Sequence, residues 1–195
     1  PRLLDLGKGV VIELDIRMLP EESLAKMQTL LQDEYEEYVR CFDGERHWGL
    51  RVNTLRCAPQ EFERRAPFPV TPVPWIPNGF YYDGESERPA RHPYYYAGLY
   101  YLQEPSAMTP AQLLGVKPGE RVLDLCAAPG GKSTELGACL EGQGLLFSND
   151  ISNTRAKALL KNLELFGVKN ICVSSETPKR LLAAFPEYHL NQTPL

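Results

Sequence analysis

Residues 121–134 read Arg-Val-Leu-Asp-Leu-Cys-Ala-Ala-Pro-Gly-Gly-Lys-Ser-Thr. The apolar run from Val122 to Leu125 predicts a buried strand, and Gly130 and Gly131 predict a tight turn that opens a helix. In such a turn the backbone can come close to a ligand, and the free N–H groups of the helix N-terminus point at it. The stretch therefore predicts a cofactor site in an α/β domain.

An acidic residue follows at the spacing expected for a ribose partner. Asp150 lies about 20 residues beyond the glycines, at the end of a second apolar stretch at residues 145–147. A carboxylate at that place can accept both hydroxyls of a ribose. Together the two features favour a cofactor that contains a nucleoside. The alternative is a strand–helix turn that binds no ligand.

The loop excludes two common nucleotide sites. A Walker loop needs a leading glycine, and Cys126 stands at that position. The dinucleotide pattern Gly-x-Gly-x-x-Gly is missing because Ala127, Ala128 and Pro129 fill the turn, and the proline removes one N–H donor. A cofactor with a ribose and no phosphates fits better, which favours S-adenosylmethionine.

The loop and its flanking segments resemble those of one enzyme family. Residues 124–133, Asp-Leu-Cys-Ala-Ala-Pro-Gly-Gly-Lys-Ser, resemble the cofactor motif of the NOL1/NOP2/Sun family of RNA cytosine-5 methyltransferases, in particular its bacterial ribosomal RNA branch. Residues 50–55, 101–108 and 149–156 resemble further segments of that family. The likeness extends over residues 19–187, and the ten-residue loop makes it specific.

The resemblance implies a set of binding positions. Asp150 would hold the ribose of S-adenosylmethionine, with Arg155 near it, and Glu176 would face the adenine. Arg51 and Asn53 belong to another family motif and are candidates for contact with RNA. The positions that would hold the methionine part of the cofactor are Cys126, Ala127, Ala128, Pro129, Gly130, Gly131 and Lys132.

The cysteines of the chain do not match those of the family's reaction. Methylation at C5 of cytosine needs a thiolate that adds to C6 of a base turned out of its stack. In the family the two cysteines involved lie in later Pro-Cys and Thr-Cys motifs, and this chain contains neither. The resemblance therefore implies no catalytic residue here and a fragment that is inactive alone. The cysteines present are Cys41, Cys57, Cys126, Cys139 and Cys172, and we interpret the last three as packed or core residues.

Two classes of function remain open. The chain is either the N-terminal part of an enzyme that methylates ribosomal RNA, or a module that binds S-adenosylmethionine and RNA without turnover. A transfer RNA methyltransferase of the same family is a further alternative. A DNA or protein methyltransferase is disfavoured by the segments Arg-Val-Asn-Thr at 51–54 and Gln-Glu-Pro-Ser at 103–106.

The composition is that of an ordinary soluble chain: 195 residues, 43% hydrophobic and 24% charged, with a net charge of −4. The acidic balance argues against a stand-alone RNA-binding module, although it permits local recognition of RNA. No apolar run is long enough to cross a membrane. The odd number of cysteines, with no Cys-x-x-Cys pair, supports neither a metal site nor a disulfide framework, and indicates a cytoplasmic protein.

The sequence predicts an α/β fold in two domains after a leader. Residues 1–17 form the leader, residues 18–105 a small α+β domain with a proline-rich connection, and residues 106–195 a truncated Rossmann-like domain that binds S-adenosylmethionine. Residues 67–93 hold seven prolines, which predict an extended connection with short edge strands. Aromatic residues among arginines, at 48, 80–82 and 94–96, either stack on RNA bases or cover the domain junction.

Helix and strand patterns give the expected elements. A helix begins at Pro20, and its buried face carries Leu24, Met27, Leu31, Tyr35 and Tyr38. The second domain has strands at 121–125, 144–148 and 170–174 and helices at 132–140, 153–166 and 178–185. The helix at 153–166 is capped by Ser152 or Asn153, ends at Gly167, and places Ala156, Leu159, Leu160, Leu163 and Phe166 on one face. Three parallel strands in the order 3-2-1 make half of a doubly wound sheet.

That half-sheet leaves its first strand as an apolar edge. Residues 9–16, Gly-Val-Val-Ile-Glu-Leu-Asp-Ile, read as a strand. We hypothesise that this segment, or a second copy of the chain in a self-associated form, pairs with the edge. The alternative is that the leader is non-native and has no function.

Overall fold

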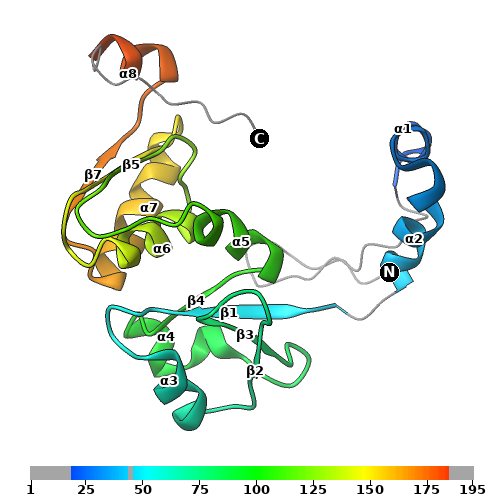
Figure 1. Ribbon diagram of the computed structural model, residues 1–195, viewed down its shortest axis with the longest axis horizontal. Helices are drawn as coiled ribbons and strands as arrows, with labels where there is room; N and C mark the ends of the chain where they lie inside the picture. The colour runs from blue at the N-terminus through cyan, green and yellow to red at the C-terminus, as the bar shows by residue number, and fades with distance from the viewer. Residues whose placement is uncertain (1–18, 44–45, 185–195) are drawn as a thin grey trace. The chain divides into compact units, whose positions relative to one another are not determined.

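The computed structural model describes residues 19–43 and 46–184 and divides the chain into two compact units, residues 1–46 and 47–195. In the first unit, α1 (Glu21–Leu31), η2 (Gln32–Glu34), α2 (Tyr35–Arg40) and η3 (Cys41–Asp43) follow one another (Figure 1). Pro20 is the N-cap of α1, one residue before the expected first turn. The residues predicted for a buried face are only half-buried, because short helices alone cannot enclose a core.

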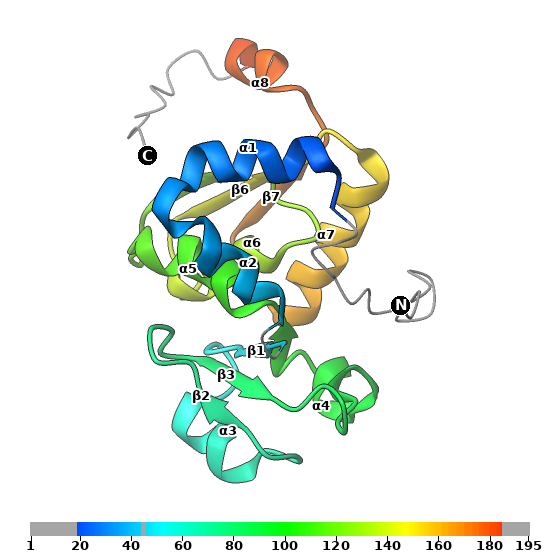
Figure 2. The ribbon, with the colours of Figure 1, turned by 90° about the vertical axis from the view of Figure 1, so that its right-hand side faces the viewer.

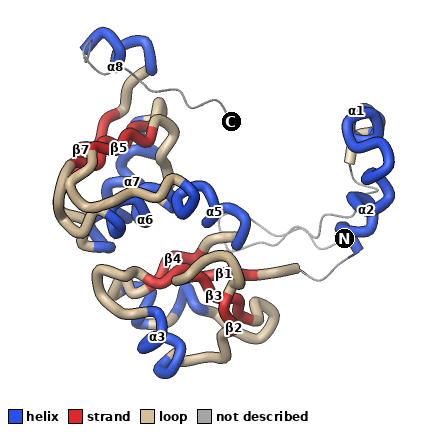
Figure 3. The backbone as a smooth tube through the Cα atoms, in the orientation of Figure 1, coloured by secondary structure: helices blue, strands red, loops and turns tan. Residues whose placement is uncertain are grey.

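The second unit begins with a four-stranded antiparallel sheet of order β2-β3-β1-β4 (Figure 3). Its strands are β1 (Trp48–Val52), β2 (Thr71–Pro72), β3 (Gly79–Tyr82) and β4 (Tyr100–Leu102), and its helices are α3 (Pro59–Arg65), η4 (Pro89–Arg91) and α4 (Pro93–Tyr96). On one face Leu50 lies opposite Phe80 and Leu102, and this row packs on Phe62 of α3. Aromatic side chains therefore fill the core of the small sheet.

The proline-rich segment is part of this sheet. β2 is an edge strand, as the prolines predict, but the prediction of edge strands only is wrong for β3, which lies between β2 and β1. β3 can be an inner strand because the prolines at 72 and 77 precede it and the next follows at 89. Tyr82, Tyr94 and Tyr95 pack against the aromatic core, whereas Tyr96 is exposed.

A parallel sheet of β5 (Arg121–Asp124), β6 (Leu145–Asn149) and β7 (Ile171–Ser174), in the order β5-β6-β7, confirms the predicted half of a doubly wound fold. Figure 2 shows β6 and β7 with α6 (Gly131–Cys139) and α7 (Asn153–Phe166) beside them. Val122 and Leu146 point toward these helices and pack with Leu136, Leu159 and Leu163. The other helices here are α5 (Pro105–Leu113) and α8 (Pro178–Ala184).

The opposite face of the parallel sheet carries a row of apolar side chains. Strand register places Leu123 next to Phe147 and Phe147 next to Cys172. Leu123 is 37% exposed, Phe147 is half-buried and Cys172 is exposed. The prediction of a core position is therefore wrong for Cys172, because the alternation of the strand turns its side chain away from α6 and α7. The prediction of a packed residue is also wrong for Cys126, which is exposed in the loop after β5, and Cys139 is half-buried.

Helix α7 agrees with its prediction at both ends. The Ser152 side chain accepts a hydrogen bond from the amide of Arg155, and Gly167 ends the helix in the left-handed region with φ of 76°. Of the five residues predicted to share one face, four are buried: Ala156, Leu159, Leu163 and Phe166. Leu160 is 38% exposed, because it lies at the border of the apolar stripe.

The strand predicted to pair with the edge of β5 lies outside the described residues. Among the described residues, β5 pairs with β6 on one side. The strand expected at residues 9–16 lies among residues that the structure does not describe, as does the end of the chain beyond residue 184. None of the described helices is long and apolar enough to cross a membrane.

Candidate functional site

The carboxyl ends of the three parallel strands bring the predicted binding positions together. The loop at 126–132 follows β5, Asp150 follows β6 and Glu176 follows β7. In open α/β sheets ligands bind at this edge, outside the carboxyl ends of the strands. The fold therefore brings together, at one edge of the sheet, residues that lie far apart in the sequence, from Cys126 to Glu176.

Asn149, the last residue of β6, connects the three strand ends. Its Nδ2 donates to the carbonyl oxygens of Leu125 (3.2 Å) and Glu176 (2.9 Å). Its Oδ1 accepts hydrogen bonds from Ser174 Oγ (2.7 Å) and from the Glu176 amide (3.0 Å). The side chain is buried and uses all its hydrogen-bonding capacity. Sequence reasoning missed this role, and the available signal was an amide ending an apolar strand just before Asp150.

The glycines of the loop are explained by packing behind it. Gly130 has a φ of 113°, and a Cβ there would lie 3.2 Å from Leu159 Cδ1 on α7. A Cβ on Gly131 would lie 2.9 Å from Gln103 Nε2. Both added atoms would therefore point at other parts of the protein. The glycines allow the turn to pack on α7 and on the segment after β4.

The remaining loop residues divide into buried and exposed ones. Ala127 and Ala128 are buried, and the Ala127 amide donates to the carbonyl of Asn149 at 2.8 Å. Cys126, Pro129 and Lys132 are exposed, and the Pro129 carbonyl accepts a hydrogen bond from Asn162 of α7 at 2.7 Å. The first amides of α6 cannot bond within the helix, so this N-terminus suits a negatively charged ligand group.

Asp150 and Arg155 form one unit beside the loop. The Asp150 side chain is 3% exposed; its Oδ1 accepts the Ser152 amide at 3.0 Å, and its Oδ2 lies 3.4 Å from Arg155 Nη2. The same Nη2 donates to the carbonyl of Ala128 at 2.7 Å. Arg155 is 58% exposed.

Glu176 lies at the rim of this edge. Its backbone is fixed by Asn149, and its carboxylate is 3.0 Å from Arg180 Nη1, in the first turns of α8. Below the loop, the Ser133 hydroxyl donates to Asp124 Oδ2 at 2.8 Å and shares a hydrogen bond with Ser148 at 2.9 Å. These contacts hold α6 to β5 and β6.

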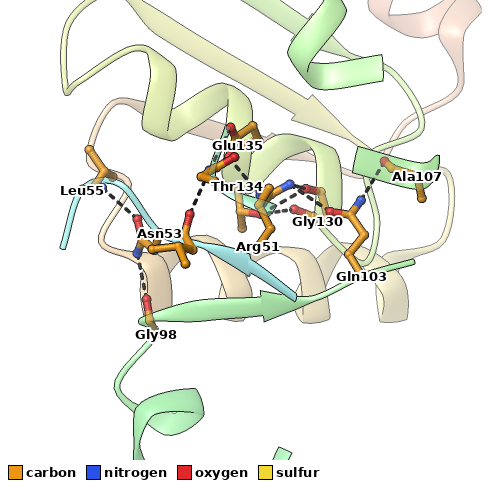
Figure 4. Close-up of polar contacts among 12 residues, drawn as sticks. Arg51, Asn53, Leu55, Gly98, Gln103, Ala107, Gly130, Thr134 and Glu135 are labelled. Carbon is orange, nitrogen blue, oxygen red and sulfur yellow. Dashed lines mark hydrogen bonds and ion pairs between the residues drawn. The ribbon is translucent and has the colours of Figure 1, made fainter. Parts of the chain in front are cut away.

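Arg51 lies inside the protein, 1% exposed (Figure 4). Its Nη1 donates to the carbonyl of Gly131 at 2.6 Å and to Gln103 Oε1 at 2.9 Å, and its Nη2 donates to Thr134 Oγ1 at 2.7 Å. Its Nε lies 2.9 Å from Glu135 Oε2, so the two side chains form an ion pair, but the N–H group of Nε makes no hydrogen bond. Burial lowers the pKa of Arg51, which Glu135 partly opposes, and an arginine stays protonated in a protein.

Asn53 is also buried. Its Nδ2 donates to the carbonyl of Gly98 at 2.8 Å and to that of Phe166, in the last turn of α7, at 2.9 Å. The side-chain groups of Arg51 and Asn53 are thus used within the protein. This placement gives no support to their prediction as RNA contacts.

Other sites are poorly developed in the described part of the chain. A hollow of about 90 Å³ is lined by Tyr95, Tyr101, Leu102, Asn162, Leu165 and Phe166. It is smaller than the roughly 300 Å³ of a small-molecule site. Residues 19–43 and 46–184 contain no group of three or more His, Cys, Asp or Glu side chains suited to a metal ion. Burial raises the pKa of the Cys57 and Cys139 thiols, which reduces their thiolate fraction.

Two family models match nearly the whole described chain. The model of the N-terminal domain of 16S rRNA methyltransferase RsmF matches residues 19–105, and the model of 16S rRNA methyltransferase RsmB/F matches residues 111–184. Ribosomal RNA small subunit methyltransferase F of Vibrio cholerae is 36% identical over 169 residues, which are 80% of this chain and 35% of that protein. The corresponding protein of an Enterobacter species is 32% identical over 181 residues, which are 86% of this chain and 37% of that protein. The chain thus spans about a third of the length of these relatives.

Solved structures share the fold. A methyltransferase homologue from Pyrococcus horikoshii superposes with a TM-score of 0.77 at 28% identity, over 87% of this chain and 57% of that one. NSun6 from Pyrococcus horikoshii, solved with SFG, gives a TM-score of 0.72 at 16% identity, over 87% of this chain and 67% of that one. The second likeness is one of fold alone.

Proposed function

Because the chain belongs to the RsmB/F family of 16S rRNA methyltransferases, we propose that its second unit holds S-adenosylmethionine for the methylation of ribosomal RNA. The whole protein would transfer the methyl group to C5 of a cytosine in the cytoplasm. S-adenosylmethionine, when bound, supplies the methyl group on its sulfonium sulfur. The residues described here bind and orient this donor.

One observation carries the proposal. Asn149 ties the ends of β5, β6 and β7 together, so that the loop, Asp150 and Glu176 lie at the same edge of the sheet. The hydrogen-bond donors and acceptors at this edge match the parts of S-adenosylmethionine. The first amides of α6 match the methionine carboxylate, Asp150 matches the ribose hydroxyls, and Glu176 can accept from the adenine amino group.

Arg155 has two roles in this proposal. In the described conformation it neutralises Asp150 and holds the Ala128 carbonyl. When a ribose binds, its guanidinium leaves Oδ2 and remains close enough to contact the sugar. The exposed side chain permits this motion without disturbing the core.

We further propose that these 195 residues do not transfer methyl groups by themselves. The sequence contains neither the Pro-Cys nor the Thr-Cys motif that the family resemblance implies for catalysis. The competing function is a module that binds S-adenosylmethionine and RNA without turnover, and the family also allows transfer RNA as the substrate. Adding the remainder of a family catalytic domain would restore methyl transfer if the chain is part of an enzyme, and would not do so if the chain is a binding module.

Two exposed thiols allow a direct test of cofactor binding. Cys126 lies in the loop, and Cys172 lies on the sheet face turned away from α6 and α7. Alkylation would be followed by peptide mass spectrometry, with calorimetric titration of S-adenosylmethionine in parallel. We expect the cofactor to slow modification of Cys126 and to leave Cys172 unchanged. If the cofactor leaves the rate of alkylation of Cys126 unchanged, as at Cys172, and no heat of binding is measured, the proposal is contradicted.

A methyl-transfer assay on the same preparation tests the proposal that these 195 residues do not transfer methyl groups by themselves. Ribosomal RNA and transfer RNA would be offered with labelled S-adenosylmethionine. We expect binding of the donor and no label in either RNA. Stoichiometric labelling of cytosine would show that the chain needs no further residues.

The proposal also includes a partner for the edge of β5, either the strand predicted at residues 9–16 or a second copy of the chain. Sedimentation velocity distinguishes a monomer from a self-associated form. Amide hydrogen exchange at residues 121–124 then reports whether the edge is paired. A monomer with rapidly exchanging edge amides would exclude both partners.

A further inference from the structure

A buried ion pair joins the antiparallel sheet to the helix of the cofactor loop. Arg51 on β1 and Glu135 on α6 approach to 2.9 Å, with side chains 1% and 6% exposed. Asn78 Nδ2 lies 3.2 Å from both carboxylate oxygens of Glu135 and 2.9 Å from the Val52 carbonyl. Burying two charges is costly, and a well-packed apolar pair is often as stable. A role in positioning would explain such an arrangement better than stability.

The guanidinium of Arg51 acts on the first turn of α6. It donates directly to the Gly131 carbonyl and to the hydroxyl of Thr134. That hydroxyl in turn donates to the carbonyl of Gly130 at 2.8 Å. Figure 4 shows Arg51, Thr134 and Gly130 side by side. Both glycines of the turn are therefore held, one directly and one through Thr134.

Gln103 completes the arrangement from the segment after β4. Its Oε1 accepts from Arg51 and its Nε2 donates to the carbonyl of Ala107 in α5. The same side chain occupies the space beside Gly131, where an added Cβ would lie 2.9 Å from its Nε2. Three segments distant in sequence thus meet at one peptide plane of the loop.

Only an arginine satisfies this set of acceptors. Its planar fork presents several donors in fixed directions, whereas lysine offers one flexible point charge. A cation near a helix N-terminus is also unfavourable with respect to the helix dipole, and Glu135 offsets this cost. The geometry therefore depends on the shape of the guanidinium as well as on its charge.

We propose that Arg51 is a positioning residue for the cofactor loop. Its guanidinium fixes the peptide plane of Gly131 and thereby the direction of the first amides of α6, which are the groups assigned to the methionine carboxylate. The small antiparallel sheet thus sets the affinity of the parallel sheet for its ligand. This inference rests on the proposed function for its ligand, S-adenosylmethionine.

The first test measures the dissociation constant for S-adenosylmethionine by calorimetry. Arg51→Met should weaken binding about tenfold or more, which corresponds to at least ~1.4 kcal/mol. Arg51→Lys should recover part of the loss because it keeps the charge. Arg56→Met is the matched control: Arg56 donates to the Leu165 carbonyl of α7 at 2.9 Å, away from the loop, and its loss should leave the constant within about twofold.

The second test needs no ligand and separates positioning from general stability. Amide hydrogen exchange and ¹⁵N shifts would be compared at residues 130–134. Arg51→Met should accelerate exchange and move the shifts there, while Arg56→Met should not. If the wild-type chain does not bind S-adenosylmethionine, the proposed function fails and this measurement still decides the role of Arg51.

A milder variant covers the case in which Arg51→Met does not fold. Thr134→Val keeps the shape of the side chain and the Arg51–Glu135 pair, and removes the link to Gly130. It should change the loop amides and weaken binding in the same direction. Unaltered loop amides and an unaltered dissociation constant in the folded variants would overturn the proposal.

Discussion

At the scale of single residues, Asn149 controls the geometry of the strand ends. Alanine at this position would leave the carbonyls of Leu125 and Glu176 and the amide of Glu176 without their partner. Each buried polar group left unpaired costs ~1–3 kcal/mol. We expect Asn149→Ala to lower the free energy of unfolding by roughly 2–4 kcal/mol, part of the loss being relieved by water.

Urea unfolding followed by circular dichroism measures this change. Asn153→Ala is the control, since Asn153 is an exposed residue four positions further on, at the start of α7. Its effect should stay within about 0.5 kcal/mol. Equal effects of the two substitutions would mean that the bonds of Asn149 contribute little.

Glu104 gives a pH-dependent prediction at the same scale. It caps α5, where its carboxylate accepts from the Ser106 hydroxyl and from the amides of Ser106 and Ala107. Burial raises the pKa of Glu104, but these hydrogen bonds outweigh it and hold the pKa below its ordinary value. A carboxyl whose pKa is lower in the folded state stabilises the fold above its unfolded pKa, roughly 4.3, and loses this effect as the pH falls.

Glu104→Ala should therefore cost ~0.5–1 kcal/mol at neutral pH, the lower part of the range for helix caps, because the side chain is exposed. The difference from wild type should shrink as the pH falls below about 4. Urea unfolding at several pH values measures it, with Glu164→Ala on the exposed face of α7 as the control. A difference that grows at acidic pH would contradict the assigned sign.

At the scale of elements, the position of a leucine within the apolar stripe of α7 decides how much it contributes to stability. Leu163 is fully buried against the sheet, whereas Leu160 is 38% exposed on the same helix. Leu163→Ala removes a side chain from a packed core and should cost ~2–5 kcal/mol. Leu160→Ala is the matched control and should cost less than about 1 kcal/mol. Thermal or urea unfolding compares the two, and similar losses would place both residues in the core.

Elements with local signals were predictable. The β5 strand, the glycine turn, α7 with its Ser152 cap and Gly167 end, and the parallel order of the strands all follow from patterns within about 30 residues. The inner position of β3 was missed because pairing with β1 decides it, and no local pattern reports that pairing. The exposure of Cys172 was missed because an apolar strand does not reveal which of its faces a helix covers.

At the scale of the whole molecule, the least predictable part of the site was its support. The binding positions at the strand ends are read from motifs, but Arg51 contacts Gly131 and Thr134 across 80 and 83 residues of sequence. Only the folded chain brings such groups together. The same motif suggested an RNA contact for Arg51, because a sequence shows that an arginine is present and not that it is buried.

Binding of S-adenosylmethionine should stabilise the second unit as a whole. A ligand at 100 times its dissociation constant adds about 2.7 kcal/mol to the free energy of unfolding. For a chain of this size we expect the melting temperature to rise by roughly 5–10 °C in a thermal shift measurement. Asp150→Asn should reduce the shift, and Glu164→Gln should preserve it. No shift in the wild-type chain at saturating ligand would contradict the assigned site.

The saturated bonding of Asn149 also bears on the chemical ageing of the protein. Deamidation of an asparagine requires its side-chain carbon to be attacked by the next backbone nitrogen, here that of Asp150. That nitrogen donates to the Ser174 carbonyl at 3.2 Å, and the Asn149 amide is clamped from both sides. Native packing therefore protects the residue, and a single unfolding event exposes it. A chain deamidated while unfolded would carry a second carboxylate beside Asp150 and two carbonyls facing an acceptor, so it would not regain the native strand ends.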